Sequence, residues 1–222
     1  MSPPSFHKGE TMYRYLLFDL DGTLTDSQEG ITKSADYALR TVAGIHTEDL
    51  STLTPYIGPP LIDGFMENHH LDYDTAVRCK DAYRSRYEKV GLFENRVYDG
   101  IPEALARLQA AGRTLALATS KPEVFAQRIL DHFDLTRYFT VICGATIDGR
   151  ISQKGEVIEE TLRRLDGPSP AETIMIGDRR HDVQGAKAHG LDTLGVLFGF
   201  GSAEELQNAG AAALAETPAA MA

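Results

Sequence analysis

Short hydrophobic runs alternate with amphipathic segments along most of the chain. The first apolar run, at residues 15–18, has the length of a β-strand, and four later runs resemble it: 114–120, 141–144, 173–178 and 193–197. Between the later runs, hydrophobic residues recur three or four positions apart, as in helices that bury one face. This alternation predicts an α/β fold, in which helices cover both faces of a Rossmann-like parallel sheet.

The segment between residues 27 and 95 interrupts this alternation, because its hydrophobic spacing is helical. Its expected elements are a helix from Ile31 to Val42, a loop at 54–60, and helices at 61–68 and 74–90. An all-helical insert after the first strand predicts a separate cap domain. The expected organisation is therefore a tail at 1–12, an α/β core made of 13–26 and 96–222, and an inserted cap at 27–95.

Composition and charge narrow the class of protein. The 222 residues are 42% hydrophobic and 24% charged, as in globular proteins with a substantial core. A formal net charge of −10 argues against general binding to nucleic acid or to an anionic membrane, because clustered Lys and Arg usually mediate both. The two cysteines, Cys79 and Cys143, are far apart and are expected to be reduced thiols of a cytoplasmic protein.

The two ends of the chain carry further expectations. Residues 1–11 lack the apolar segment of a secretory signal, and no apolar run reaches membrane-spanning length. Near the other end, Ser202 and Glu205 predict a capped helix, and the alanine-rich tail 209–222 is expected to be partly disordered at its end. We expect a monomer or a homodimer.

Two aspartates, Asp19 and Asp21, directly follow the first apolar run, and Gly22 and Thr23 then end the strand pattern. Side chains two positions apart in a strand point to the same side. Two carboxylates this close cannot both stay ionised in a partly buried cleft without a cation or a shared proton. The pair therefore indicates a metal site or an acid/base pair, unless the two residues merely solvate or cap the strand end.

Two later apolar runs also end in residues suited to ligand binding. Thr119 and Ser120 end one run and precede a helix, where a hydroxyl and backbone N–H groups form either an anion site or a simple helix cap. Asp178 ends another run. Because parallel sheets bind ligands at the carboxyl ends of their strands, Asp19, Thr119 and Asp178 are expected to meet at one edge.

Four motifs together resemble those of the haloacid dehalogenase-like hydrolase superfamily. They are Phe18-Asp19-Leu20-Asp21-Gly22-Thr23, Thr119-Ser120, Lys154 just before a helix, and Gly177-Asp178 followed by Asp182. The resemblance implies that Asp19 is the nucleophile of phosphoryl transfer and that Asp21 is the general acid/base.

The same resemblance implies the groups that bind substrate and metal. Thr119, the backbone of Ser120, and Lys154 would hold the phosphoryl group. Lys121 competes with Lys154 for its role, because a glycine follows Lys154 where the family commonly has proline. Asp182 would bind a metal-bound water or orient Lys154. The residues that would bind Mg²⁺ are Asp19, Asp21 through its backbone carbonyl, and Asp178.

The helical insert resembles the family's C1-type cap, which closes over the site, with hinges expected near 26–28 and 95–98. The acid at Asp21 favours phosphate esters, because a halide leaves without a proton. We expect a phosphoric monoester hydrolase that acts on a small phosphorylated metabolite, in the phosphoglycolate phosphatase-like or 5'-nucleotidase-like branch. Two alternatives stay open: a phosphomutase of the β-phosphoglucomutase type, and a non-catalytic protein that binds a phosphorylated ligand.

Overall fold

The computed structural model of the protein describes residues 7–8 and 11–222, which fall into two compact units. The core unit runs up to Thr25 and resumes at Val97, and the helical unit is Asp26–Arg96. At the two crossings the chain forms β4 (Thr25–Asp26) and β5 (Arg96–Val97), which pair with each other. Of the expected tail at 1–12, residues 1–6 and 9–10 lie outside the described residues, and the rest forms the antiparallel pair β1 (His7–Lys8) and β2 (Thr11–Met12).

Six parallel strands form the sheet of the core unit, in the order β10-β9-β8-β3-β6-β7. Their bounds are β3 (Tyr15–Phe18), β6 (Thr114–Pro122), β7 (Val141–Ala145), β8 (Thr173–Gly177), β9 (Asp192–Val196) and β10 (Ala213–Ala215). Strand β3 pairs with β6 on one side and β8 on the other, so that Leu17 lies opposite both Ala116 and Met175. The expected parallel sheet is confirmed, and its strand order changes direction at β3, which places a ligand site at the end of that strand.

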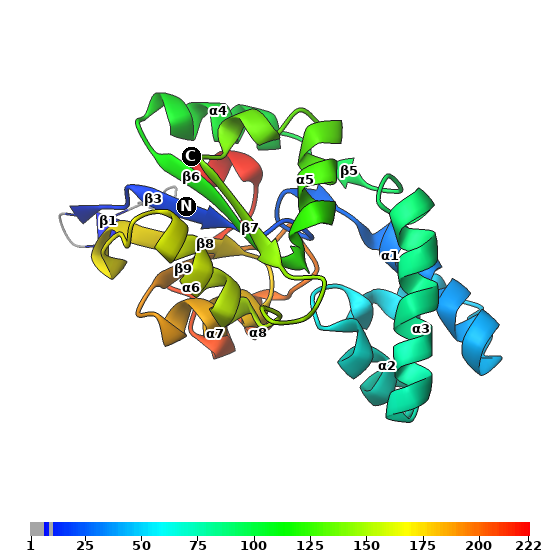
Figure 1. Cartoon of the computed structure of the whole chain (residues 1–222). Helices are drawn as coiled ribbons and strands as arrows, with labels where there is room; N and C mark the ends of the chain where they lie inside the picture. Colours follow the sequence, from blue (N-terminus) through cyan, green and yellow to red (C-terminus); the bar gives the residue numbers. More distant parts are fainter. Residues whose placement is uncertain (1–6, 9–10) are drawn as a thin grey trace. The chain divides into compact units, whose positions relative to one another are not determined.

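Helices cover both faces of this sheet (Figure 1). On one face lie α4 (Ile101–Ala110) and α5 (Glu123–His132), and on the other lie α6 (Lys154–Arg164) and α7 (Arg180–Ala188). Helix α8 (Ala203–Ala209) packs against α7. Single 3-10 turns, Thr136–Tyr138 and Pro170–Glu172, lead into β7 and β8.

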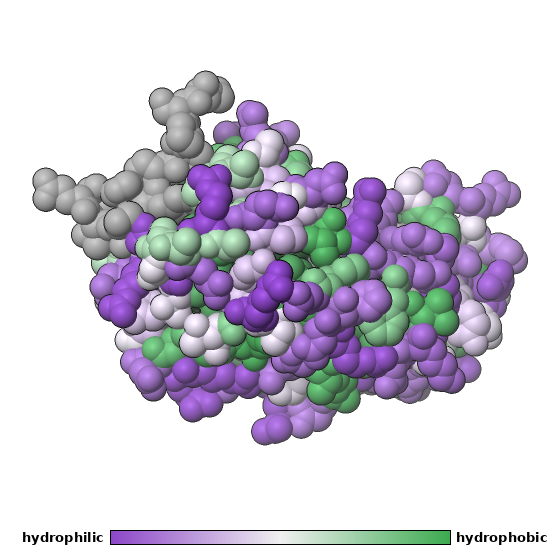
Figure 2. All heavy atoms as spheres, turned by 90° about the horizontal axis from the view of Figure 1, so that it is seen from above, coloured by the Kyte–Doolittle hydropathy of each residue, from purple (hydrophilic) through white to green (hydrophobic). Residues whose placement is uncertain are grey.

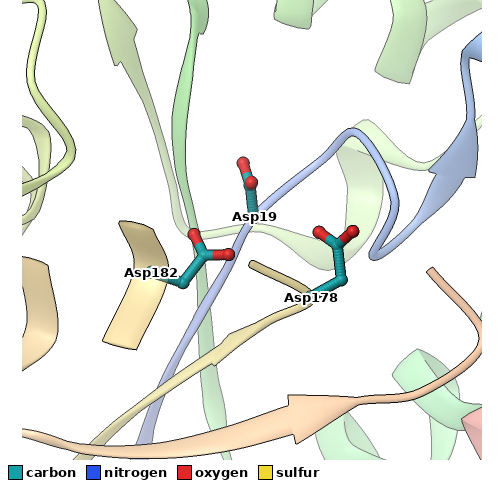
Figure 3. Close-up of side chains that lie close together, drawn as sticks. All are labelled: Asp19, Asp178 and Asp182. Carbon is teal, nitrogen blue, oxygen red and sulfur yellow. The ribbon is translucent and has the colours of Figure 1, made fainter. Parts of the chain in front are cut away.

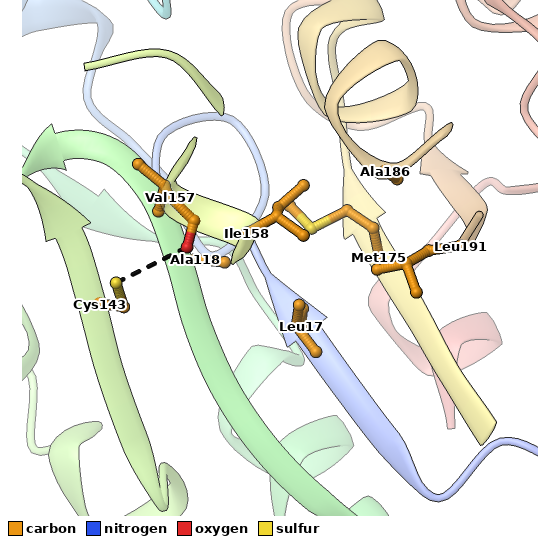
Figure 4. Close-up of a cluster of buried hydrophobic side chains, with 8 residues drawn as sticks. All are labelled: Leu17, Ala118, Cys143, Val157, Ile158, Met175, Ala186 and Leu191. Carbon is orange, nitrogen blue, oxygen red and sulfur yellow. Dashed lines mark hydrogen bonds between the residues drawn. The ribbon is translucent and has the colours of Figure 1, made fainter. Parts of the chain in front are cut away.

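A hydrophobic cluster shows why the strand sequences are apolar without alternation (Figure 4). Side chains of β3, β6, β7 and β8 pack there against α6 and α7. The members are Leu17, Ala118, Cys143, Val157, Ile158, Met175, Ala186 and Leu191. The thiol of Cys143 donates to the backbone carbonyl of Val157 at 3.7 Å, and both Cys79 and Cys143 are buried free thiols, as expected. Because helices cover both faces, most positions of the central strands are buried, whichever face they point to.

Between β4 and β5 the second unit consists of helices. Its elements are α1 (Gln28–Ala38), a π-helical turn (Leu39–Ala43), a 3-10 helix (Leu50–Tyr56), α2 (Leu61–His69), α3 (Tyr73–Arg86) and a second π-helical turn (Tyr87–Gly91). The prediction of a loop at 54–60 is wrong for its first three residues, because residues 54–56 belong to the 3-10 helix. That helix begins where the Asp49 carboxylate accepts the Ser51 N–H at 2.9 Å.

The C-terminal segment is folded, and the expectation of partial disorder at the end of 209–222 is wrong, because residues 218–221 form a 3-10 helix. Strand β10 adds to the edge of the sheet beside β9, with Leu214 opposite Gly195. A closing 3-10 helix, Pro218–Met221, contacts α4 and buries the Met221 side chain completely. Alanine carries little hydrophobic signal, so the sequence pattern did not reveal this strand.

The surface seen in Figure 2 is mostly hydrophilic, and its hydrophobic side chains lie in small separate patches. Such scattered side chains are normal on a folded protein. Among the helices of residues 7–8 and 11–222, none combines the length and the apolar character needed to cross a membrane.

Candidate active site

Three strand ends meet at the carboxyl edge of the core sheet. Asp19 directly follows β3, and its backbone N–H donates to the Ile176 carbonyl of β8 at 2.9 Å. Asp178 directly follows β8, and Thr119 lies near the end of β6. Because β3 pairs with both β6 and β8, the structure brings Asp19, Thr119 and Asp178 to one edge.

A buried acidic cluster occupies this edge (Figure 3). Carboxylate oxygens of Asp19, Asp178 and Asp182 lie within 4.8 Å of one another. Asp182 comes from the first turn of α7 and is buried like Asp178, whereas Asp19 keeps 8% of its surface exposed. The sequence-based interpretation gave Asp182 either a metal-bound water or Lys154 as its partner, and the structure places its carboxylate within 4.8 Å of those of Asp19 and Asp178.

Asp178 has polar partners of its own. Oδ2 accepts the backbone N–H of Phe200 at 2.8 Å, and Oδ1 accepts the Thr23 hydroxyl at 3.4 Å. Within residues 7–8 and 11–222 it forms no ion pair. Burial, and then the neighbouring charges of Asp182 and Asp19, raise the pKa of the Asp178 carboxyl well above its usual range. This carboxyl group is therefore poised for a cation that the protein itself does not supply.

Lys154 is the cation closest to Asp19. It begins α6, and its Nζ lies 2.9 Å from Oδ1 of Asp19 and 2.8 Å from Oδ1 of Asp182. Nζ also donates to the Ala118 carbonyl at 3.0 Å. Burial lowers the pKa of Lys154, but Asp182 and Asp19 more than offset it, so the pKa is raised and the ammonium group is charged. The two competing lysines are thus distinguished, because Lys154 is the one that contacts Asp19.

Asp182 is held by a backbone N–H group of the preceding loop as well as by Lys154. Its Oδ2 accepts the Arg179 N–H at 3.0 Å, as a residue in the first turn of a helix commonly does. Burial raises the pKa of Asp182 to about 6, although Lys154 lowers it. This geometry fits the expected role of orienting Lys154.

Asp21 pairs with the second lysine. Oδ2 of Asp21 lies 2.8 Å from Nζ of Lys121, and the Lys121 side chain is buried, whereas the Asp21 side chain keeps 11% of its surface exposed. Gly22, with φ +81°, turns the chain immediately after it. The two aspartates of the first motif therefore have different lysine partners, Lys154 for Asp19 and Lys121 for Asp21.

Thr119 and Ser120 line the end of β6. The Thr119 side chain is buried, and its Oγ1 accepts the Lys121 N–H at 3.3 Å. Ser120 is half-buried. A hydroxyl whose lone pair accepts this N–H keeps its own proton available for an anionic oxygen, so Thr119 suits the expected phosphoryl-binding role.

Comparison with known proteins identifies the family that carries this arrangement. The sequence model of the haloacid dehalogenase-like hydrolases matches residues 16–196, which include all seven site residues expected from the sequence. The chain belongs to this family.

Several known proteins are similar to this chain over most of its length. A 5'-nucleotidase of Pseudomonas aeruginosa is 47% identical over 195 residues, covering 88% of this chain and 87% of the relative. A tyrosine-protein kinase PtkA of Mycobacterium tuberculosis is 43% identical over 190 residues, covering 85% of this chain and 64% of that protein. The crystal structure of a predicted phosphatase from Clostridium acetobutylicum has a TM-score of 0.90 and 49% identity, covering 93% of this chain and 95% of that one.

These similarities confirm the family and the α/β fold that the motifs predict. Relatives named 5'-nucleotidase and phosphoglycolate phosphatase confirm the expected branch of the family, which is phosphoglycolate phosphatase-like or 5'-nucleotidase-like. Together with the family match, they establish a phosphatase, a phosphoric monoester hydrolase of the haloacid dehalogenase-like family.

Two residues of this haloacid dehalogenase-like site were missed by the sequence analysis. Phe200 acts through its backbone N–H, which no side-chain pattern reveals, although the glycines on both sides of it indicate a close approach of the backbone. Glu205 was expected to complete a capping box with Ser202. Its carboxylate instead accepts from Arg179 Nε at 3.0 Å and from the Arg180 N–H at 2.9 Å, which fixes the loop between Asp178 and Asp182.

Proposed function

We propose that the protein is a Mg²⁺-dependent phosphatase that hydrolyses a small-molecule phosphate monoester through an aspartyl phosphate formed on Asp19. One observation carries the proposal. The Asp19 carboxylate stands in a buried acidic cluster, with one of its oxygens 2.9 Å from the Lys154 ammonium group. A carboxylate held in this way is a suitable nucleophile toward a phosphoryl group whose charge the surrounding cations neutralise.

The chain's residues fit a divalent metal ion. The three carboxyl groups of the cluster have one ammonium partner, Lys154, which contacts Asp19 and Asp182 and leaves Asp178 without an ion pair among the described residues. Carboxylate and carbonyl oxygens are the ligands that Mg²⁺ prefers. The residues that would hold it are Asp19, Asp178 and, through its backbone carbonyl, Asp21. When bound, the ion would neutralise charge on the transferring phosphoryl group.

In the first step, a carboxylate oxygen of Asp19 attacks phosphorus and the bond between phosphorus and the ester oxygen breaks. Asp21 gives its proton to that leaving oxygen, so that an alcohol departs. In the second step, Asp21 takes a proton from water as the water oxygen attacks phosphorus. The bond from Asp19 to phosphorus then breaks, which releases phosphate and restores both carboxyl groups.

The remaining residues bind and orient. The Thr119 hydroxyl would donate to a phosphoryl oxygen, together with the backbone N–H of Ser120. Lys154 neutralises Asp19 before the reaction and the phosphoryl oxygens during it, and Asp182 keeps Lys154 in place through the 2.8 Å ion pair. The helical unit, 26–96, is proposed to act as the cap that admits only small substrates.

The first substrate class to test is the nucleoside 5'-monophosphates. The relative named 5'-nucleotidase is 47% identical and is matched over nearly its whole length, which supports this class over phosphoglycolate. A phosphomutase would use the same aspartyl phosphate but pass the phosphoryl group to a second hydroxyl. It would release little phosphate from simple monoesters without a sugar bisphosphate primer.

Phosphate release from a panel of phosphorylated metabolites, measured with Mg²⁺ and with a chelator, tests the proposal. We expect Mg²⁺-dependent release by the wild type and none by Asp19→Asn. The matched control is Asp148→Asn, which removes an exposed carboxylate whose ion-pair partner is Arg150 and not a residue of the site, and this variant should keep full activity. No release from any ester, or release that survives Asp19→Asn, would overturn the proposed function.

A further inference from the structure

The two carboxylate oxygens of Asp21 differ in their partners. Its Oδ2 lies 2.8 Å from Nζ of Lys121, whereas its Oδ1 is buried and has no hydrogen-bond partner among the described residues. Proton transfer to a leaving group needs a carboxyl group with a fixed orientation and with one oxygen that no other protein group occupies. The pair with Lys121 supplies the fixed orientation and leaves Oδ1 for the proton.

We propose that Lys121 is a positioning residue for the acid/base carboxyl group. It anchors Oδ2 of Asp21, so that Oδ1 faces the ester oxygen of the substrate. The inference rests on the proposed function, because it takes Asp21 as the acid/base, but it assigns a role to a lysine that the motifs left without one.

The local backbone is built to bring Lys121 to this position. From Thr119 to Pro122, β6 advances three residues while its partner β7 advances only one, from Gly144 to Ala145. Ser120 and Lys121 therefore bulge out of the strand pairing. The bulge is possible because Gly144 has no side chain: a β-carbon there would lie 2.5 Å from the Lys121 carbonyl oxygen.

The segment after the bulge is fixed in turn. The Gly144 N–H donates to Oε2 of Glu123 at 3.3 Å, and the same oxygen lies 2.9 Å from Arg164 of α6. The Lys121 side chain is only 4% exposed. A lysine buried this deeply needs a polar partner, because an isolated buried charge is costly, and the Asp21 carboxyl group is a partner that it contacts directly.

The role predicts a dependence on the leaving group. A nitrophenolate leaves without a proton, so its departure does not need a positioned acid, whereas the 5'-alkoxide of a nucleoside must be protonated as it leaves. A lysine that instead bound the phosphoryl group would matter equally for both esters. The ratio kcat/KM is the suitable measure, because it covers the steps up to departure of the first product and excludes the later attack by water.

The experiment compares adenosine 5'-monophosphate with p-nitrophenyl phosphate for wild type, Lys121→Met, Asp21→Asn and the double variant. We expect Lys121→Met to lower kcat/KM for the nucleotide about 100-fold and for the nitrophenyl ester no more than about threefold. In the Asp21→Asn background the same lysine change should cause little further loss for the nucleotide, because both act through one proton transfer. Lys121→Arg should recover part of the loss.

Equal losses for the two esters in Lys121→Met, or additive losses in the double variant, would overturn the assignment. Thermal unfolding of each variant shows whether it is folded. If Lys121→Met is unstable, the double variant, which removes both charged groups of the pair, is the folded protein in which the losses can still be compared. Should the wild type release phosphate from neither ester, the proposed function itself would fall and the role of Lys121 with it. If only the pattern of losses fails, the proposed function stands and the lysine assignment alone is wrong.

Discussion

Gly22 and Asp178 approach each other so closely that a β-carbon on Gly22 would lie 2.2 Å from Oδ2 of Asp178. The two residues are far apart in sequence, one after β3 and the other after β8. Gly22 also has φ +81°, a backbone conformation that favours glycine. The glycine of the first motif is therefore required twice, for its turn and for the space that the Asp178 carboxylate occupies.

Gly22→Ala should displace Asp178 as well as strain the turn. We expect activity to fall about 100-fold, because a shift of about 1 Å at a reacting site can cost that much. Gly112→Ala is the matched control: its φ is +75°, but no atom lies within 4 Å of an added β-carbon. That change should cost about 1 kcal/mol of stability and leave phosphate release intact. Equal effects of the two substitutions on activity would contradict this account of Gly22.

Asp178→Asn separates metal binding from folding. The variant loses one of three mutually repelling buried carboxylates, so without metal it should be at least as stable as the wild type. Wild type should gain about 2.7 kcal/mol when Mg²⁺ is present at about 100 times its Kd, and the variant should gain nothing. Thermal unfolding with and without Mg²⁺ measures the stability of each protein and the stability that it gains from the ion. The control Asp148→Asn should gain as much stability from Mg²⁺ as the wild type. An undiminished gain in Asp178→Asn would exclude this carboxylate as a ligand.

The parts of the site that the sequence predicts are those that depend on side chains at strand ends. Asp19, Thr119 and Asp178 each end an apolar run, and parallel strands necessarily bring such ends to one edge. The N–H of Phe200 could not be predicted in this way, because its contribution is a backbone group. The partner of Lys121 depends on a bulge in β6, which no periodic pattern contains.

The C-terminal segment shows a second limit of sequence patterns. Ala213 to Ala215 form an edge strand, although alanine is neither β-branched nor strongly apolar. The fold of this segment depends on a tertiary contact, the burial of Met221.

Met221→Ala should therefore destabilise the core unit. The side chain is fully buried, and truncating a buried methionine costs about 2–5 kcal/mol because it leaves a cavity. Glu216→Ala, an exposed position in the same segment, should change stability very little. Chemical denaturation of both variants gives the comparison, and a Met221→Ala protein as stable as the wild type would show that the segment contributes nothing to the fold.

The helical unit contains an acid-sensitive contact. Arg86 lies 2.8 Å from Glu94 and, together with Lys33, lowers the pKa of the Glu94 carboxyl below its ordinary value of 4.5, although partial burial opposes the shift. A carboxyl group whose pKa is lower in the folded protein than in the unfolded chain stabilises the folded state at pH values above its ordinary pKa. This contribution is lost as the pH falls through the lowered pKa of the folded state.

Glu94→Gln should thus destabilise the protein at neutral pH, and the difference from wild type should shrink progressively below pH 4.5. Unfolding measured across this range tests the expectation. Glu29→Gln serves as the control, because Glu29 pairs with the same Lys33 at an exposed position and contributes little. A difference that is constant with pH would show that the Glu94 charge is not responsible.

The most direct measurement is to trap the phosphorylated enzyme. The protein would be quenched in acid during turnover of a nucleoside 5'-monophosphate with Mg²⁺, reduced with borohydride, and digested for peptide mass spectrometry. Because borohydride converts an aspartyl phosphate to homoserine, we predict that position 19 alone is converted during turnover. Protein that has not been given substrate should show no conversion. Conversion at another aspartate, or none while phosphate is being released, would contradict the assignment of Asp19 as the nucleophile.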